Sequence, residues 1–373
     1  MPKERAKVNS RRGILICGSY GHGNAGDEAI LEAIIASFRG KDPAMPITVL
    51  SRSPEDTEKR HGVKAIYKFN MPAVFAAMTK AKLFISGGGS LIQDATSSRS
   101  LYYYLYTIKM AKLLGCKVIM YGCGIGPVSR PFNRKMSRIV INRFVDAITL
   151  READSLKELR AFGVTHLRAQ VSSDPALTLE KSPDSETDAA MTALGLDPHG
   201  NYLCIVPRKW PGFESKAESF AKCADAIYAK YGYETLFLSI DHKNDAMAAE
   251  IISRHMASPH AIAPDVLPPH LTIGILSRMK AVISMRLHGL IFSAGQGVPL
   301  VGVSYDPKVN SFLRYIGSSC CIDLRGLTEE RLINETEKAL SQSAEERSRR
   351  IEKLRRMESI NLTEALDLLE EEA

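Results

Sequence analysis

The stretch that decides the fold is GILICGSYGHGNAGDEAIL, residues 13–31. It leads from an apolar, strand-like run, Gly13–Gly18, through a glycine-rich turn into a helical stretch, Asp27–Arg39. Strand, turn and helix in this order begin a Rossmann-like unit, in which the ligand lies beyond the strand and faces the helix N-terminus. The turn lacks the GK[ST] of a Walker A loop and is not a clean GxGxxG fingerprint. We therefore expect a ligand site at this turn, of a kind that neither motif identifies.

The same alternation of short apolar runs and amphipathic stretches continues along the chain. The other strands expected in the first half are Ile47–Ser51, Ala65–Phe69, Leu83–Ser86, Lys117–Tyr121 and Ala147–Arg151. The helical stretches between them are Ser100–Leu114, Phe132–Phe144 and Ala153–Phe162. Such alternation predicts parallel strands, because only a crossover connection returns the chain in the same direction.

The pattern stops in a polar stretch, Glu180–Gly200, and then starts again. The later expected strands are Tyr202–Val206, Thr235–Ile240, Ala281–Met285, Leu300–Ser304 and Cys321–Leu324, and a long charged helix is expected over Glu345–Glu372. We predict an α/β protein with two Rossmann-like domains facing each other across a cleft, residues 1–180 and 201–343. A linker over 181–200 joins them, and a helical tail over 344–373 follows.

Composition limits the class of protein. The 373 residues are 45% hydrophobic and 24% charged, which is typical of a globular chain. No window is apolar over the roughly 18 residues that a membrane-spanning helix needs. The basic N-terminus leads directly into a strand, without the apolar stretch of a secretory signal, so we expect a cytoplasmic protein. The seven cysteines show no CxxC spacing and the histidines no HxxxH or HExxH spacing, so we expect buried thiols and no metal site.

The formal charge of +7 fits an anionic partner of some kind. Nucleic acid is the weakest candidate, because no zinc-finger, RRM or helix-turn-helix signature and no basic block with interleaved aromatics is present. A phosphorylated small substrate and an anionic membrane surface remain. A basic N-terminal arm could contact such a membrane, although an arm of this kind is more often a solvated tail; its basic residues are Lys3, Arg5, Lys7, Arg11 and Arg12.

The turn after the first strand supplies the first candidate site residues. Gly21 lets the backbone approach a ligand closely, and Asn24, Asp27 and Glu28 stand at the start of the following helix. Carboxylates in this position are often only helix caps or dipole partners. Alternatively, one of these side chains orients or deprotonates a substrate hydroxyl.

A second candidate site follows the strand at Leu83–Ser86, in GGGSLIQDATSSRS, residues 87–100. The backbone N–H groups of Gly88 and Gly89 suit a phosphate or a sugar hydroxyl. Gln93, Asp94 and Arg99 follow on polar positions. Weaker signals come from a third glycine turn, YGCGIGP at 121–127, from Arg151 at a strand end, and from Asp174 before Pro175.

The second domain carries the sharpest constellation, AVISMRLHGLIFSAGQGVPLVGVSYDPK, residues 281–308. Arg286 ends a strand and offers a bidentate fork for a carboxylate or phosphate. His288 stands where the next helix begins and could bind an anion or transfer a proton. The remaining candidates for substrate contact follow other strands of this domain: Arg208, the only tryptophan, Trp210, and then Asp306 and Lys308.

Together these segments resemble the polysaccharide pyruvyl transferase family, most closely its cell-wall (CsaB-type) members. The matching segments are GSYGHGNAGDEAIL, SGGGSLIQDATSSRSLYYYL, CGIGP, TLREADS, SSDPAL, MRLHGLIFSAGQGVPLVGVSYDPKV and FLRYIG, in order from residue 18 to 317. The resemblance implies a GT-B-like fold. It also implies transfer of pyruvate from phosphoenolpyruvate to two hydroxyls of a sugar, with formation of a cyclic ketal and release of phosphate.

The resemblance further implies roles and partners. Arg286 and His288 would form the donor site. The chemistry of the reaction also needs a base at the acceptor, for which Asp27 and Glu28 are the candidates. The CsaB-type acceptor is N-acetylmannosamine of a lipid-linked secondary cell-wall polymer that anchors S-layer proteins. We therefore expect phosphoenolpyruvate and a glycan as partners, peripheral contact with the inner face of the cell membrane, and no separate cofactor.

Two other functions fit the same residues. A nucleotide-sugar glycosyltransferase of GT-B fold would use similar glycine turns and a basic donor site. A non-catalytic glycan-binding protein derived from such an enzyme is the third hypothesis. Phosphate release from phosphoenolpyruvate separates the first function from both.

Overall fold

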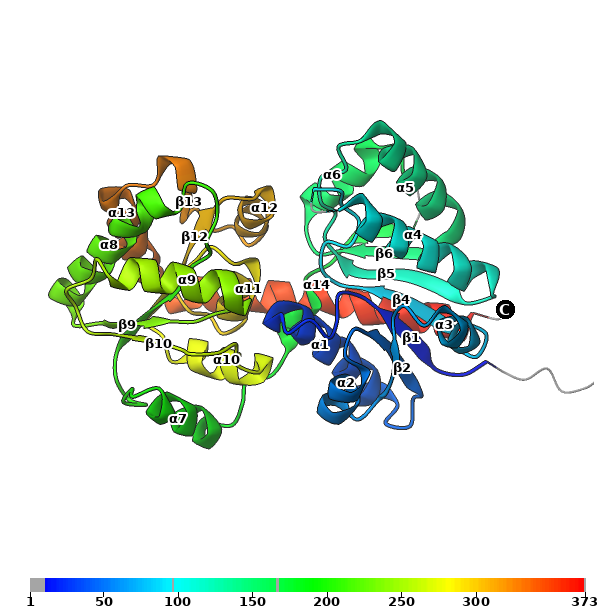
Figure 1. Cartoon of the computed structure of the whole chain (residues 1–373), viewed down its shortest axis with the longest axis horizontal. Coiled ribbons are helices and arrows are strands. Elements are labelled where there is room, and N and C mark those ends of the chain that lie inside the picture. Colours follow the sequence, from blue (N-terminus) through cyan, green and yellow to red (C-terminus); the bar gives the residue numbers. More distant parts are fainter. Residues whose placement is uncertain (1–10, 96, 166–167, 372–373) are drawn as a thin grey trace, which may run out of the picture.

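The computed structural model describes residues 11–371 except 96, 166 and 167, and Figure 1 shows two lobes, each built on one parallel sheet. The first sheet has the order β3-β2-β1-β4-β5-β6-β7 and the second β10-β9-β8-β11-β12-β13. The first six strands of the first sheet and all six strands of the second follow the 3-2-1-4-5-6 order of doubly wound folds. The predicted α/β fold with two Rossmann-like domains is confirmed. Lys3, Arg5 and Lys7 of the basic arm lie outside the described residues.

The first domain contains seven strands and six α-helices within the described residues. Its strands are β1 (Ile14–Cys17), β2 (Ile47–Ser51), β3 (Lys64–Tyr67), β4 (Leu83–Gly87), β5 (Lys117–Cys123), β6 (Ala147–Leu150) and β7 (Ala169–Val171). Its helices are α1 (Ala25–Lys41), α2 (Pro54–His61), α3 (Met71–Met78), α4 (Ser98–Leu113), α5 (Pro131–Phe144) and α6 (Ala153–Ala161). A short 3₁₀ turn, η1 (Pro175–Thr178), ends the domain.

The second domain repeats this design. Its strands are β8 (Tyr202–Val206), β9 (Glu234–Phe237), β10 (His260–Ile262), β11 (Ala281–Ser284), β12 (Leu300–Ser304) and β13 (Cys321–Asp323). Its helices are α7 (Asp184–Ala193), α8 (Ala217–Tyr231), α9 (His242–Ser253), α10 (Pro269–Ser277), α11 (Leu287–Gly295), α12 (Pro307–Tyr315) and α13 (Glu329–Leu340). Helix α14 (Ala344–Glu370) follows as the C-terminal helix.

The stretch expected to be a polar linker over 181–200 forms helix α7 instead. One face of this helix is apolar enough to be buried, with Met191 fully covered, and it packs against α10. Arg278 reaches Asp184 and Asp188 on the helix at 3.2 and 3.1 Å. The polar composition of α7 therefore belongs to a solvated helix face and not to an extended linker.

The two domains share part of their core. One buried apolar cluster includes Ile34 of α1, Leu177 of η1, Leu290 of α11 and Leu368 of α14. Helix α14 starts from the second domain and runs back against β5, β6 and η1 of the first, as Figure 1 shows. The domains are therefore held together by a continuous core as well as by the chain that joins them.

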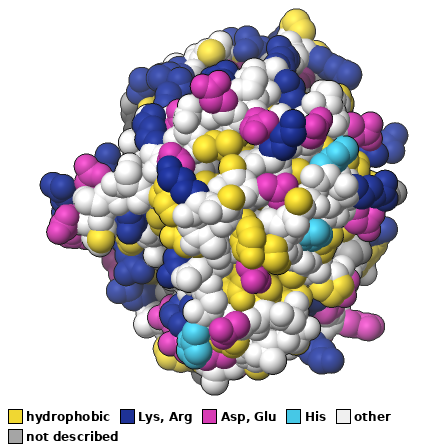
Figure 2. All heavy atoms as spheres, turned by 90° about the vertical axis from the view of Figure 1, so that its left-hand side faces the viewer, with side chains coloured by type: hydrophobic (Ala, Val, Ile, Leu, Met, Phe, Trp, Pro, Cys, Tyr) yellow, Lys and Arg dark blue, Asp and Glu magenta, His cyan; other side chains and the backbone are white. Residues whose placement is uncertain are grey.

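The surface and the cysteine side chains limit which kinds of protein and of site this chain can form. None of the helices in the described chain is long and apolar enough to cross a membrane. On the face of the second domain in Figure 2, basic and acidic side chains are interspersed around scattered hydrophobic ones. The seven cysteines are free, and all except Cys321 are buried, as expected from the sequence. Within the described residues, no group of three His, Cys, Asp or Glu side chains is placed to hold a metal ion.

Candidate active site

The candidate site lies where the switch points of the two sheets come together. The order of strands reverses between β1 and β4 in the first sheet and between β8 and β11 in the second, and open sheets bind ligands at such points. Helix α1 begins at this point and reaches the other domain, since Ala25 N donates to Ile240 O at 3.0 Å. A Cβ atom on Gly26 would lie 1.9 Å from Nδ1 of His288. Glycine is therefore required at 26, because the imidazole occupies that space.

Asn24 and Glu28 shape the first turn of α1. Asn24 is the N-cap: its Oδ1 accepts from Gly26 N at 3.0 Å and from Asp27 N at 3.2 Å. Glu28 is buried, and its Oε1 accepts from Gly21 N at 2.8 Å. The structure thus places Gly21, Asn24 and Glu28 beside the site, with both side chains engaged in holding the glycine turn.

Asp27 is the carboxyl of this turn that, within the part of the chain described, accepts no backbone hydrogen bond, whereas Glu28 accepts one from Gly21. Its side chain is half-buried, and a Cβ atom on Gly89 would lie 3.4 Å from its Oδ1. Burial, and then the neighbouring Glu28, raise the pKa of Asp27 to about 7, although Ser19, Arg151 and Lys308 oppose the rise. Near neutral pH the carboxyl can therefore both release and accept a proton.

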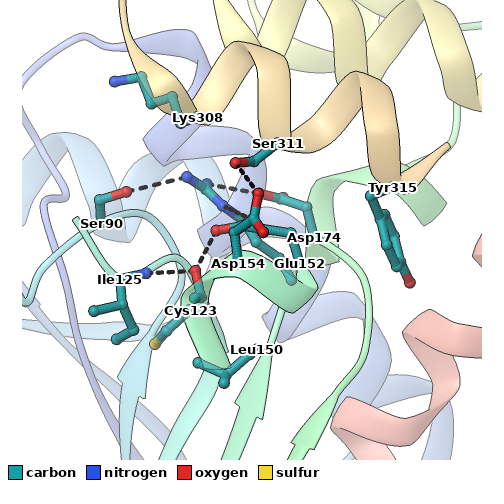
Figure 3. A network of polar contacts seen from close by, with 12 residues as sticks. Ser90, Cys123, Ile125, Leu150, Glu152, Asp154, Asp174, Lys308, Ser311 and Tyr315 are labelled. Atoms are coloured by element: carbon teal, nitrogen blue, oxygen red, sulfur yellow. Dashed lines mark hydrogen bonds and ion pairs between the residues drawn. The ribbon is translucent and has the colours of Figure 1, made fainter. Parts of the chain in front are cut away.

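Arg151, which directly follows β6, is a buried cation of the first domain, and Figure 3 shows its partners Ser90, Glu152 and Asp174. Its Nη1 contacts Asp174 Oδ2 at 3.0 Å, its Nε contacts Glu152 Oε2 at 3.0 Å, and its Nη2 donates to Ser90 Oγ at 3.1 Å. Gly88 and Gly89 adopt left-handed φ values of 58° and 65°, which turn the loop so that Ser90 reaches the guanidinium. The sequence pointed to Arg151 and Asp174 without giving either a role.

His288 faces this network from α11. Its Nε2 lies 3.9 Å from Asp174 Oδ2 and is buried without a hydrogen-bond partner in the described residues. Burial lowers the pKa of His288 to about 4, against the pull of Asp174. The ring is therefore neutral at physiological pH, and a buried nitrogen without a partner is suited to a ligand.

Arg286 is held by two aspartates that the sequence did not identify. Its Nε lies 2.7 Å from Asp245 Oδ1, and its Nη2 lies 2.5 Å from the same oxygen and 2.9 Å from Asp241 Oδ2. Asp245 is buried and also accepts from the backbone N–H groups of Ile240 and Asp241. One side of the predicted fork is thus occupied. Among the described residues, Nη1 has no hydrogen-bond partner and is the nitrogen left for a ligand.

Arg208 and Trp210 stack beside Arg286. The Arg208 guanidinium lies 5.1 Å from the ring centroids of both Trp210 and Tyr305, and its Nη1 donates to the Tyr305 hydroxyl at 2.5 Å. Its Nε is buried without a partner in the described chain. These contacts place Arg208, Trp210 and Tyr305 at the carboxyl ends of β8 and β12, on either side of β11.

Lys308 and Asp306 lie at the start of α12. Asp306 Oδ1 accepts from Lys308 N at 3.1 Å and caps the helix, while its Oδ2 lies 3.3 Å from Lys308 Nζ. Lys308 acts on the pKa of both Asp27 and His288. The lysine therefore adds positive charge to the centre of the site.

Three predicted substrate contacts have other surroundings. Asp94 accepts from Ser129 N at 2.8 Å and from Arg130 N at 3.0 Å, and thereby ties the loop after β4 to the loop after β5. Gln93 packs against Gly126, whose Cβ would lie 2.5 Å from Gln93 Cβ. Arg99 is exposed in the first turn of α4. Within the described residues, neither Asp94 nor Arg99 has a hydrogen bond or ion pair with Arg151 or His288.

Similar solved structures define the class of protein as GT-B-like. Anabaena Alr3699/HepE in complex with UDP and glucose superposes with a TM-score of 0.63 at 11% identity, over 95% of this chain and 99% of that one. The UDP-GlcNAc 2-epimerase of Methanocaldococcus jannaschii gives 0.62 at 11% identity, over 89% and 93%. At such identities the likeness shows the fold alone.

The family follows from the sequence comparison. The model of the family described as polysaccharide pyruvyl transferase matches residues 24–307, so this chain belongs to the polysaccharide pyruvyl transferase family. A similar protein is the amylovoran biosynthesis protein AmsJ of Erwinia amylovora, 23% identical over 369 residues, which cover 82% of this chain and 86% of AmsJ. The family resemblance seen in the sequence is confirmed, and with it a transferase of polysaccharide biosynthesis.

Proposed function

We propose that this chain transfers the pyruvyl group of phosphoenolpyruvate to two hydroxyls of one sugar, as a cyclic ketal, and releases phosphate. The single observation that carries the proposal is the set of donors at the interdomain site. Arg151, Lys308 and Arg286 all act on the pKa of His288, whose Nε2 is unpartnered among the described residues, and Arg151 and Lys308 also act on Asp27, a carboxyl with a pKa of about 7. Phosphoenolpyruvate needs such a set, because it carries both a carboxylate and a phosphate.

The proposed donor site divides its work between the domains. Nη1 of Arg286 and Nε of Arg208 have open hydrogen-bonding capacity on the second domain, and Arg151 and Lys308 add charge from both sides. The N-termini of α1 and α11 add partial positive charge toward the same point. His288 remains neutral and donates one hydrogen bond, from Nε2–H, to the bound anion.

In the proposed reaction, one side chain both supplies and recovers a proton. A proton adds to C3 of phosphoenolpyruvate and makes the methyl group, which leaves oxocarbenium character at C2. One sugar hydroxyl adds to C2 and loses its proton; the second hydroxyl then displaces phosphate, which leaves with that hydroxyl's proton. Asp27 suits the carrier, since its pKa of about 7 lets it give the first proton and recover one from the attacking hydroxyl. The scheme requires no cofactor besides the donor substrate.

The acceptor that we propose is N-acetylmannosamine of a lipid-linked secondary cell-wall polysaccharide, as in the CsaB-type members. Family membership and the exopolysaccharide relative support a polysaccharide acceptor. An enzyme of lipid-linked precursors would work in the cytoplasm at the inner face of the membrane. The modified polymer would then anchor S-layer proteins.

The test is a phosphate-release assay with phosphoenolpyruvate and a panel of glycan acceptors that includes N-acetylmannosamine glycosides. We expect acceptor-dependent phosphate release, unchanged by EDTA, and loss of it in His288→Gln. A parallel arm supplies UDP-sugars and measures UDP. Release of UDP, with none of phosphate from phosphoenolpyruvate, would establish the nucleotide-sugar glycosyltransferase instead.

A further inference from the structure

Lys68, directly after β3, is a buried cation that the proposed reaction does not use. Its exposed fraction is 6%, and among the described residues no carboxylate lies within ion-pair distance of its Nζ. The hydrogen-bond partner of Nζ is Nε2 of His22, at 3.4 Å. Buried lysines are rare unless they are paired, so this one needs an explanation.

Aromatic rings surround the ammonium group. Nζ lies 5.5 Å from the ring centroids of Phe69 and Tyr103 and 6.0 Å from that of Tyr104. Phe69 is 51% exposed and Tyr67, in edge contact with it, is 38% exposed. The rings partly stabilise the cation, and the two exposed ones form an open aromatic wall of the kind on which sugar faces stack.

A second cation stands at the mouth of this cluster. Arg52, after β2, lies over the Tyr67 ring at 5.5 Å and donates to its hydroxyl. Burial lowers the pKa of Lys68, and Arg52 lowers it further, while Cys17 and Asp27 oppose them. His22 has its pKa lowered by burial, Lys68 and Arg52, and so leaves the positive charge with the two long side chains. Charges of one sign that repel each other favour a bound anion between them.

The cluster is continuous with the candidate active site. Burial raises the pKa of the Asp27 carboxyl and of the Tyr104 hydroxyl. A hydrogen bond with Ser19 lowers the pKa of each of these two groups. Ser19 therefore lies beside both groups. Tyr103 also donates to Lys68 O at 2.9 Å and fixes the lysine against α4. Asp27 also acts on the pKa of Lys68, so a ligand on the aromatic wall would lie next to Asp27.

We infer that Lys68, Arg52, Tyr67, Phe69 and Tyr103 form a subsite for an acceptor glycan with an anionic group, carboxylate or phosphate, next to the sugar that is modified. This inference rests on the proposed function, with Asp27 as the group at the reacting hydroxyl. The anion binds between Lys68 and Arg52, and the sugar lies on Tyr67 and Phe69. A neutral glycan leaves the two cations without a counter-charge and binds less tightly.

The test measures binding without phosphoenolpyruvate, so that it stands apart from the transfer reaction. The affinities of glucuronic acid, glucose 1-phosphate and methyl glucoside are measured by saturation-transfer NMR titration for the parent, Lys68→Met, Arg52→Gln and the control Lys64→Met. Lys64 lies on the same edge strand and is exposed. Thermal melts followed by circular dichroism check that each variant folds. If Lys68→Met does not fold, Arg52→Gln carries the test, because Arg52 is exposed.

We expect at least one anionic sugar to bind the parent about tenfold more tightly than methyl glucoside, as charge-assisted hydrogen bonds require. Lys68→Met and Arg52→Gln lose this preference, and Lys64→Met retains it. Preference for glucuronic acid or for glucose 1-phosphate identifies the anion as carboxylate or phosphate. Equal or undetectable binding of all three sugars to the parent, or a preference that survives in the folded variants, would overturn the inference even if phosphate release were observed.

Discussion

At the residue scale, the site depends on Asp27 and His288, whose pKa values are shifted in opposite directions by their surroundings. Burial raises the pKa of Asp27 to about 7 and lowers the pKa of His288 to about 4. Neighbouring titratable groups with strongly shifted pKa values are typical of active sites. Here they favour the carboxyl as the proton carrier and the neutral imidazole as a ligand of the donor.

Replacement of the carboxyl should test the first assignment. We expect Asp27→Asn to lower turnover about 10²- to 10⁴-fold, the usual contribution of a general acid or base. The parent rate should also show an ionisation near pH 7 that the variant lacks. Initial rates of phosphate release from pH 5.5 to 9 measure both; a parent profile without this ionisation would contradict the role of Asp27.

The same carboxyl should make stability depend on pH. Between the ordinary pKa near 4 and the folded value of about 7, the folded protein holds a proton that the unfolded chain has lost. The contribution of Asp27 to stability is therefore full below pH 4, falls as the pH rises to about 7, and is constant above. Urea unfolding at pH 5 and 8 should show a smaller loss of stability for Asp27→Asn than for the parent.

The lowered pKa of His288 can be measured directly by titration of its imidazole ring. Because the folded value of about 4 lies below the ordinary value near 6.5, the ring should stay neutral down to about pH 5 in the free protein. NMR titration of the imidazole, assigned through His288→Gln, measures it. Protonation with a midpoint near 6.5 would show that the ring is not buried as described.

Sequence alone identified many of these residues but not their states. The motifs led to Asp27, Arg286 and His288, because strand ends and helix starts can be placed from periodicity. The choice between Asp27 and Glu28 required the structure, in which Glu28 bonds to Gly21. Asp245 and Lys68 were missed, because their roles come from partners, at residues 286 and 22, far away in sequence.

At the element scale, helix α1 connects the two halves of the site. Its cap, Asn24, orients the turn, and its second residue, Gly26, lies against His288 of the other domain. The helix contains a second glycine, Gly40, at its far end, where an added Cβ would meet no atom within 4 Å. The two glycines allow a matched experiment within one helix.

Alanine at the two positions should have opposite consequences. Gly26→Ala should impair activity, because its methyl group would enter the space of the His288 ring and push α1 and α11 apart. Gly40→Ala should leave activity unchanged and raise the free energy of unfolding by about 0.5–1 kcal/mol, as helix propensity predicts. Phosphate release and urea unfolding of both variants test this; full activity of Gly26→Ala would contradict the described contact.

The elements that sequence reasoning missed were the short or polar ones. Strands β7 and β10 have three residues each, too few for an alternating pattern to appear. The composition of α7 predicts a linker, because its buried residues are outnumbered by exposed polar ones. The strands of four or more residues and helices α1, α4, α5, α6 and α14 are predicted from the sequence, since packing and periodicity agree there.

At the scale of the whole molecule, the C-terminal helix and a few polar ties fix the two domains against each other. Asp154 of the first domain accepts from Ser311 Oγ and Arg314 Nη2 of the second, both at 2.6 Å, and Figure 3 shows the first of these contacts. In α14, buried Asn361 accepts from Ser172 Oγ at 2.7 Å and donates to Ser173 O at 2.9 Å. The tie at Asp154 is partly exposed, so the bonds of Asn361 should matter more for stability.

The role of α14 as a strap between the domains is testable at Asn361. We expect Asn361→Ala to lower the free energy of unfolding by about 1–3 kcal/mol, because it leaves buried polar groups of the first domain unpaired. Ser359→Ala, two residues away and exposed, is the control and should change stability little. A variant of Asn361 as stable as the parent in urea unfolding would show that these two hydrogen bonds do not hold the helix against the first domain.

We propose that both domains together convert phosphoenolpyruvate and a glycan into a pyruvyl ketal. This conversion can be followed by mass spectrometry of the glycan product, made in D₂O with the parent and with Asp27→Asn. We predict a product heavier than the acceptor by one pyruvate less one water, with deuterium in its methyl group, and little or none from the variant. A product that retains the CH₂ group of phosphoenolpyruvate, or an unmodified glycan with every acceptor, would contradict the claim.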